Sequence, residues 1–260
     1  MIQTGLKKVR KDHRDYSYIK TYGIVPTTLP DEYMADADMW MPDQMAMGLP
    51  MGCTGFTQAD LCTDEDGIIY DPRDLYEATP PGGRDGRDIR NSLKTLVSRG
   101  VRPYLTTDAP GNKRTAYFNI QRSGAIDSFD AIRLAMYSTS SENRTVSLGV
   151  PWFSEFTHPL PNGVLPIPLF DLSHATWHNC KVAGWKSIDG VPYLAIKSWQ
   201  GTRYGVNGWV YMSRELCNVL LGFKGTGAFT VTKLSHGEVQ TVDMNVVSRI
   251  ISYVRSLFGL

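Results

Sequence analysis

The order in which helix-like and strand-like segments follow one another is the feature that most constrains this fold. In the first half, residues 88–100 and 127–136 place apolar side chains at helical spacing. The second half holds short strand-like segments punctuated by Gly and Pro, at residues 145–150, 180–184, 193–197 and 209–212. Helices followed by strands are typical of an α+β protein, and we expect two lobes.

Composition narrows the class of partner. The chain has 260 residues, 20% of them charged, and a formal net charge of +1. Lys and Arg are scattered apart from a small cluster within residues 7–14, so we expect no nucleic-acid partner. No run of about eighteen apolar residues occurs, and the N-terminus has no apolar stretch. We therefore expect neither a membrane span nor a secretory signal.

The four cysteines show no metal-site spacing. They are Cys53, Cys62, Cys180 and Cys217, with no CxxC and no His/Cys pairs at zinc spacing. The even number leaves two disulfides possible, but the wide and irregular spacing favours free thiols and a reducing compartment. We expect structural roles for Cys62 and Cys180.

Cys53 stands where a helix is expected to begin. The segment 51–56 reads MGCTGF, and Phe56 and the apolar residues after it fit a helix that starts at or just after Cys53. A thiol is a useful nucleophile as the thiolate, which a helix N-terminus and a nearby imidazolium both favour. Gln44 precedes Cys53 by one loop, and its amide could bind an oxyanion together with the Cys53 backbone N–H. For an isolated cysteine, a buried structural role is the alternative.

Several segments of the first half, taken in order, resemble the papain family of cysteine peptidases, in particular its bacterial and phage members. Residues 12–16 (DHRDY) are similar to an arm that precedes the catalytic domain there. Residues 52–55 (GCTG) resemble the nucleophile motif GSCTA, with Gln44 at the oxyanion position. Residues 86–94 and 99–101 resemble the helix and turn that follow.

The second half continues the resemblance. Residues 146–151 (VSLGVP) are similar to the strand that opens the second lobe, and 177–185 (WHNCKVAGW) to the strand HAVxxVGY, which puts His178 at the catalytic position. His174 offers a competing match, but only His178 has the right distance to the GW pair at its end. Residues 193–209 resemble YxIxNSWGxxWGxNGY without a gap.

The chain departs from the family pattern at the third catalytic position. Ungapped, the family's Asn falls on Ser198 and its shielding Trp on Gln200, while a tryptophan stands one place earlier at Trp199. A one-residue slip would put Lys197 at the third position, and Lys cannot accept a hydrogen bond. We therefore assign Ser198, whose hydroxyl would hold the imidazole weakly or through water. This change is expected to slow catalysis rather than abolish it.

The resemblance implies a papain-like two-lobed fold, with a helical left lobe and an antiparallel, β-barrel-like right lobe flanking an active-site cleft. We expect the peptidase domain at 39–225, with the helical lobe at about 45–140 and the β lobe at about 141–225. Residues 1–38 would form an extended arm, which either covers the cleft or wraps the body. Residues 226–260 would form an extension that ends in an amphipathic helix suited to packing, docking or self-association.

The resemblance also implies an activity. Cys53 would attack a peptide carbonyl, Gln44 and the Cys53 N–H would bind the oxyanion, and His178 would act as general base before water hydrolyses the thioester. Such an enzyme takes a protein or peptide substrate and needs no cofactor and no metal. A cytoplasmic or virion-associated location is expected. Two alternatives stay open: a peptidoglycan endopeptidase or transamidase with the same Cys-His logic, and an inactive structural protein on the same fold.

Overall fold

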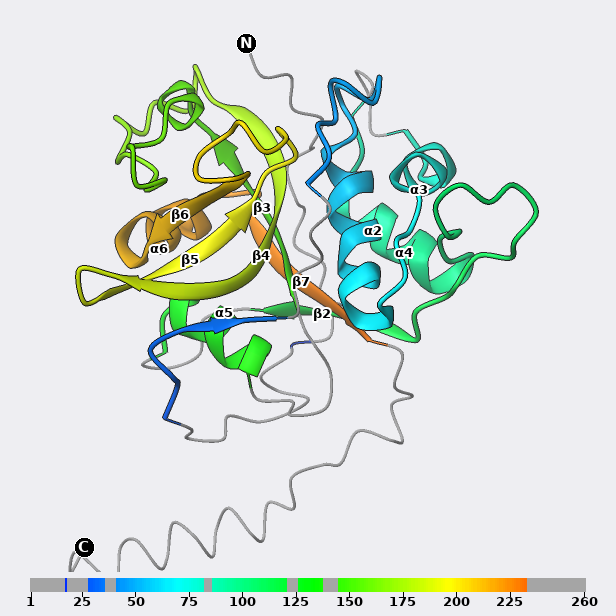
Figure 1. Ribbon diagram of the computed structural model, residues 1–260, viewed down its shortest axis with the longest axis horizontal. Coiled ribbons are helices and arrows are strands. Elements are labelled where there is room, and N and C mark those ends of the chain that lie inside the picture. The colour runs from blue at the N-terminus through cyan, green and yellow to red at the C-terminus, as the bar shows by residue number, and fades with distance from the viewer. Residues whose placement is uncertain are drawn as a thin grey trace, which may run out of the picture.

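The computed structural model describes residues 17, 28–35, 41–81, 86–120, 126–137 and 145–232. The arm motif at 12–16 and the expected C-terminal helix lie outside the described residues. Within them, a helical body and a sheet-based body stand side by side (Figure 1). The α+β class expected from the order of the segments is confirmed.

The helical body consists of α2 (Cys53–Asp66), α3 (Pro72–Ala78) and α4 (Ile89–Ser98). Helix α4 begins as the sequence predicts, because the Asp88 side chain caps it by accepting a hydrogen bond from the Asn91 N–H. Helix α3 begins in the same way at Asp71 and carries Pro at its first position. The sequence gives no clear sign of α3, since a helix of two turns shows too little periodicity to be recognised.

The sheet is antiparallel, with the strand order β2-β7-β3-β4-β5-β6, and β1 pairs with β4 outside that path. Its four predicted strands are observed, and β4 is much longer than expected. The bounds are β1 (Tyr33–Met34), β2 (Ala116–Ile120), β3 (Val146–Trp152), β4 (Thr176–Ile188), β5 (Val191–Lys197), β6 (Trp209–Ser213) and β7 (Gly227–Thr232).

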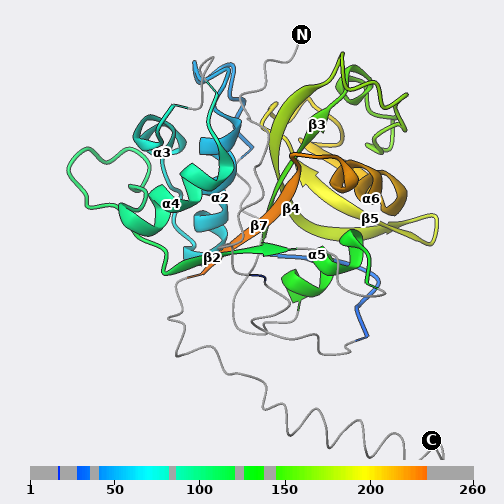
Figure 2. The ribbon, with the colours of Figure 1, turned by 180° about the vertical axis from the view of Figure 1, so that it is seen from behind.

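Strands β2 and β7 lie outside the range from which the strands of the sheet were expected. β7 follows residue 225, the expected end of the peptidase domain, yet it pairs with both β2 and β3 within the sheet. β2 lies in the range expected to be helical, and seen from behind the two strands reach from the sheet to the lower end of α2 (Figure 2). Phe229 and Val231 of β7 are buried with the core of the helical body. The sheet therefore extends to residue 232.

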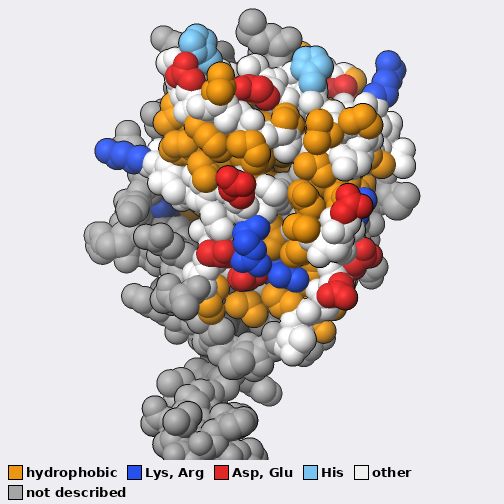
Figure 3. Space-filling view, turned by 90° about the vertical axis from the view of Figure 1, so that its left-hand side faces the viewer, with side chains coloured by type: hydrophobic (Ala, Val, Ile, Leu, Met, Phe, Trp, Pro, Cys, Tyr) orange, Lys and Arg blue, Asp and Glu red, His pale blue; other side chains and the backbone are white. Residues whose placement is uncertain are grey.

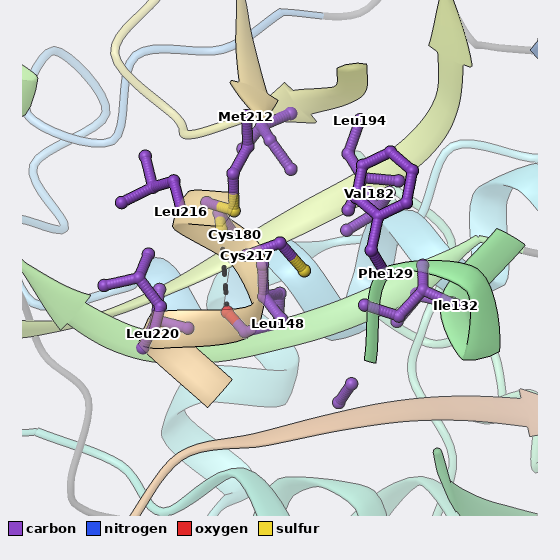
Figure 4. Close-up of a cluster of buried hydrophobic side chains, with 14 of the residues drawn as sticks. Phe129, Ile132, Leu148, Cys180, Val182, Leu194, Met212, Leu216, Cys217 and Leu220 are labelled. Atoms are coloured by element: carbon purple, nitrogen blue, oxygen red, sulfur yellow. Dashed lines mark hydrogen bonds between the residues drawn. The ribbon is translucent and has the colours of Figure 1, made fainter. Parts of the chain in front are cut away.

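A second core fills the sheet side. Helices α5 (Ser128–Tyr137) and α6 (Arg214–Gly222) pack their apolar faces against it, although α5 had been expected in the helical lobe. Figure 4 shows Phe129 and Ile132 of α5 and Leu216 and Leu220 of α6 among the buried side chains. Helices from the middle and from the later part of the chain thus close one core.

The loop between η1 (Ser154–Thr157) and β4 exposes apolar side chains. The face of the sheet body that looks away from the helices carries broad apolar areas, with charges of both signs between them (Figure 3). Four large exposed side chains come from the loop itself: Leu160, Ile167, Leu169 and Leu172. This loop leads directly into the strand that carries His178.

Within the described residues, no helix combines the length and the apolar character that crossing a membrane requires.

Candidate active site

Cys53 is the first residue of α2. Gly52 precedes it at the N-cap, where a Cβ would lie 2.9 Å from the Leu49 carbonyl oxygen, so the loop before the helix packs against a position that only glycine fills without displacement. No acidic side chain occupies the first turn of the helix. The positive end of the helix dipole therefore acts on the Cys53 sulfur without a carboxylate on the same turn to oppose it.

His178 lies on β4 and is held by the backbone of another segment. Its Nε2–H donates to the Ser198 carbonyl oxygen at 3.2 Å, and its ring meets the Trp152 ring edge-on at 4.7 Å. The Nδ1 atom has no hydrogen-bond partner among the residues that the structure describes. Because Nε2 carries the proton, Nδ1 presents a lone pair and can accept one.

Burial sets the protonation state of this imidazole. The side chain is fully buried, and loss of hydration lowers the pKa of His178 from 6.5 to about 4, against the opposing effect of the Ser198 carbonyl. The imidazole is therefore neutral at pH 7, which is the form that a general base requires.

This lowered pKa predicts that His178 accounts for part of the stability that the protein loses at acidic pH. The unfolded chain binds a proton at His178 near pH 6.5 and the folded protein near pH 4, so His178 costs stability as pH falls through that window, by about 3 kcal/mol in full. Between pH 7 and 4, the free energy of unfolding should fall less in His178→Gln than in the wild type. Urea titrations measure it, and the exposed His174→Gln should behave like the wild type; parallel wild-type and His178→Gln curves would contradict the shift.

Helix α2 contacts strand β4 close to both candidate residues. The contact joins Thr57, one turn after Cys53, to Asn179, the residue after His178. There the Thr57 hydroxyl donates to the Asn179 carbonyl oxygen at 3.1 Å, and both groups are buried. This contact ties the start of the Cys53 helix to the His178 strand. Cys53 and His178, the two residues proposed from the sequence, therefore lie on elements that contact each other close to both positions. Both are 0% exposed, so a ligand reaches them only after neighbouring groups move.

Ser198 acts through a different atom from the one expected. The hydroxyl was expected to hold the imidazole, whereas the backbone carbonyl does so. The hydroxyl instead accepts a hydrogen bond from the Gln200 amide at 2.9 Å. At Ser198, the acceptor for His178 is thus a backbone carbonyl, which any residue at this position would supply.

Gln44 is buried in the loop that leads to Cys53. Its side-chain Nε2 donates to the Pro50 carbonyl at 2.9 Å, and its backbone N–H donates to the Trp199 carbonyl at 3.0 Å. The side-chain amide is therefore held by Pro50, three residues before Cys53. The Gln44 backbone is held by the segment that also bonds to His178.

Buried ion pairs form a second tie between α2 and the sheet. Asp60 and Asp64 of α2 face Lys181 of β4, with Nζ–O distances of 2.6 and 2.8 Å, and Lys197 of β5 lies 2.9 Å from Asp60. All four side chains are at most 1% exposed. Sequence reasoning missed this set, because single charges in a helix and two strands give no sign that they meet.

The competing histidine, His174, and the cysteines other than Cys53 are not assigned to the site. His174 is 82% exposed at its side chain and bonded to Asp171 in the turn before β4. All four cysteines lie within the described ranges, are buried and form no disulfide, as the irregular spacing predicted. Cys180 and Cys217 belong to the core of the sheet body, where burial raises the pKa of both thiols (Figure 4). No cluster of metal-ligating side chains occurs within the described ranges.

Comparison with known proteins identifies the fold. No family model matches the sequence, and no curated protein matches it either. Among solved structures, xylellain, a cysteine protease from Xylella fastidiosa, is similar with a TM-score of 0.66 at 17% identity, covering 89% of this chain and 96% of xylellain. Bromelain from Ananas comosus, in complex with the E64 inhibitor, gives 0.58 at 16% identity over 78% and 99% of the two chains. Procathepsin L2 from Tenebrio molitor gives 0.62 at 16% identity over 88% and 77%.

Proposed function

We propose that this chain, which has the fold of papain-like cysteine proteases, is a cysteine endopeptidase with Cys53 as nucleophile and His178 as general base. One observation carries the proposal most. The His178 imidazole is held through Nε2 by a backbone carbonyl and keeps Nδ1 as an acceptor, on a strand that packs against the first turn of the helix begun by Cys53. A nucleophile, a base and an orienting group for the base are the parts that nucleophilic catalysis requires.

The proposed chemistry uses only these side chains. Nδ1 of His178 takes the thiol proton while the Cys53 sulfur bonds to the substrate carbonyl carbon, and the Cys53 N–H and the Gln44 amide stabilise the oxyanion. The imidazolium then gives its proton to the departing amine, which leaves a thioester on Cys53. Water attacks the thioester, His178 takes a proton from it, and the carboxylate product leaves as the thiol is restored.

The finer assignments belong to the same proposal. The resemblance to bacterial and phage members, and a cytoplasmic or virion-associated setting, rest on the sequence and stay predictions. Ser198 is proposed to orient His178 through its carbonyl rather than through its hydroxyl. The expected amphipathic helix at the end of the C-terminal extension lies outside the described residues and stays a prediction for docking or self-association.

The proposal is tested by covalent labelling. An epoxide of the E-64 type should add once to the purified, reduced protein, as intact mass shows, and Cys53→Ala should take up none. Cys62, Cys180 and Cys217 serve as internal controls, because all three are buried thiols outside disulfides to which no catalytic role is assigned. A variant without residues 1–28 is labelled in parallel, because Cys53 is fully buried in the full chain.

The labelling experiment, together with a cleavage assay, separates the peptidase from the alternatives. Faster labelling of the shortened variant would support an inhibitory arm. No adduct in either form, with both folded, would overturn the peptidase proposal and favour the structural protein on the same fold. Cleavage of cell-wall peptides, but not of unfolded protein, would instead favour the peptidoglycan endopeptidase.

A further inference from the structure

The backbone at Ser198 and Trp199 presents two successive carbonyl groups to two candidate catalytic residues. The Ser198 oxygen accepts the His178 Nε2–H at 3.2 Å, and the Trp199 oxygen accepts the Gln44 backbone N–H at 3.0 Å. The relative position of the base and the oxyanion loop therefore depends on the conformation of one peptide segment.

That segment has an unfavourable backbone conformation. Trp199 has a φ of +62°, in the left-handed region that a bulky side chain rarely adopts. Such a conformation persists only where the surroundings determine it, and it occurs most often at functional sites. The conformation of Trp199 thus requires an anchor outside its own backbone.

The anchor is the indole ring. It is 1% exposed, it lies against the Phe56 ring at 5.7 Å, and its Nε1–H donates to the Thr57 hydroxyl at 2.8 Å. The same hydroxyl donates its proton to the Asn179 carbonyl at 3.1 Å. One buried oxygen therefore joins the Cys53 helix, the His178 strand and the segment with the two carbonyls.

We propose that Trp199 and Thr57 are a positioning pair, whose hydrogen bond holds the Ser198 and Trp199 carbonyls where they orient His178 and Gln44. The inference rests on the proposed function. From the sequence, the Ser198 hydroxyl was expected to orient His178. That hydroxyl is bonded to Gln200 instead, and the proposal gives the orienting role to Trp199 and Thr57. Neither residue of the pair takes part in a bond-making step.

The test compares the pair with matched substitutions elsewhere. Thr57→Val and Trp199→Phe each remove one partner of the hydrogen bond and keep most of the volume, while Thr57→Ser keeps the hydroxyl. Thr63→Val removes another buried hydroxyl of α2, and Trp185→Phe removes another buried indole N–H, which donates to Pro30. The first readout is the rate of Cys53 alkylation by iodoacetamide as a function of pH in the full chain.

We expect Thr57→Val and Trp199→Phe each to slow alkylation by roughly 10- to 100-fold, because a misplaced base loses that much rate. Thr57→Ser should restore most of the rate, and both control variants should react like the wild type. The double variant should be no slower than the slower single variant, since both remove one interaction. Wild-type rates in Thr57→Val, an equal loss in the controls, or single effects that multiply in the double variant would overturn the proposal.

A second readout separates this inference from the proposed function. Nitrogen NMR of His178 reports which ring nitrogen carries the proton, independent of any reaction at Cys53. We expect Nε2–H in the wild type and in Thr57→Ser, and a mixture of tautomers in Thr57→Val. If wild-type Cys53 does not react, the peptidase proposal fails by itself, and an unchanged Nε2–H tautomer in Thr57→Val still overturns the positioning pair.

Discussion

Replacing His178 by Ala is expected to lower kcat/KM for a peptide substrate by about 10²- to 10⁴-fold, the usual contribution of a positioned general base. The loss follows because the Nδ1 acceptor disappears and nothing else described at this junction is assigned to take the Cys53 proton. Initial rates on a quenched fluorescent peptide measure the effect, and thermal unfolding checks that the buried substitution has not unfolded the protein.

His174→Ala is the matched control for that experiment. It removes the other histidine that fits the sequence pattern, four residues earlier, whose side chain is 82% exposed and bonded to Asp171. Its kcat/KM should equal that of the wild type. An equal loss in both variants, or full activity in His178→Ala, would mean that His178 is not the base.

Lys181→Met is expected to lower the free energy of unfolding by about 3–5 kcal/mol, the usual cost of leaving a buried charge without its partner. Lys181 forms ion pairs with both Asp60 and Asp64, whereas Lys197 forms one with Asp60, so the substitution takes from Asp64 the lysine that it pairs with among the described residues. Burial already raises the pKa of Asp64 above its usual value, because loss of hydration outweighs the attraction of Lys181. Chemical denaturation at pH 7 measures the change.

A second substitution and a second pH make this prediction specific. Asp64→Asn added to Lys181→Met should recover part of the lost stability, because the stranded charge is gone. The Lys181→Met defect should also shrink from pH 7 to pH 5, because a raised pKa lets the folded protein take up a proton that the unfolded chain does not hold. The exposed Lys94→Met should change stability little. A defect of similar size there would show that the burial of Lys181 is not its cause.

Local signals in the sequence predicted much of the fold. Asp88 and Gly100 bracket an apolar stripe, and the structure places α4 between them. Helix α3 was missed because its two turns are too short for a helical period to stand out, and strands β2 and β7 were missed as well. The pairing of β7 with β2 and β3 was hidden for a different reason: it joins segments far apart in the chain, and single-sequence patterns carry no such information.

The sequence offers candidates for the site where the chemistry requires a particular side chain, and these assignments stay predictions. Cys53, His178 and Gln44 are recognisable because a thiol, an imidazole and an amide each have few substitutes. The Ser198 carbonyl was not recognisable, because every residue has one and only the backbone path decides where it points. Thr57 and Trp199 escaped for a similar reason, since each reads as an ordinary core residue until its partner is known.

The place of β7 in the sheet has a consequence for how the protein is made. Strands β2 and β3 leave the ribosome before β7, which pairs with both of them in the finished sheet. Until then the two earlier strands have open edges, and open edges pair readily with other chains. A nascent chain that stops at residue 225 would keep both edges open although it already contains every proposed catalytic residue. We therefore expect the protein to complete folding only after residue 232 has emerged, and to depend on protection from aggregation until that moment.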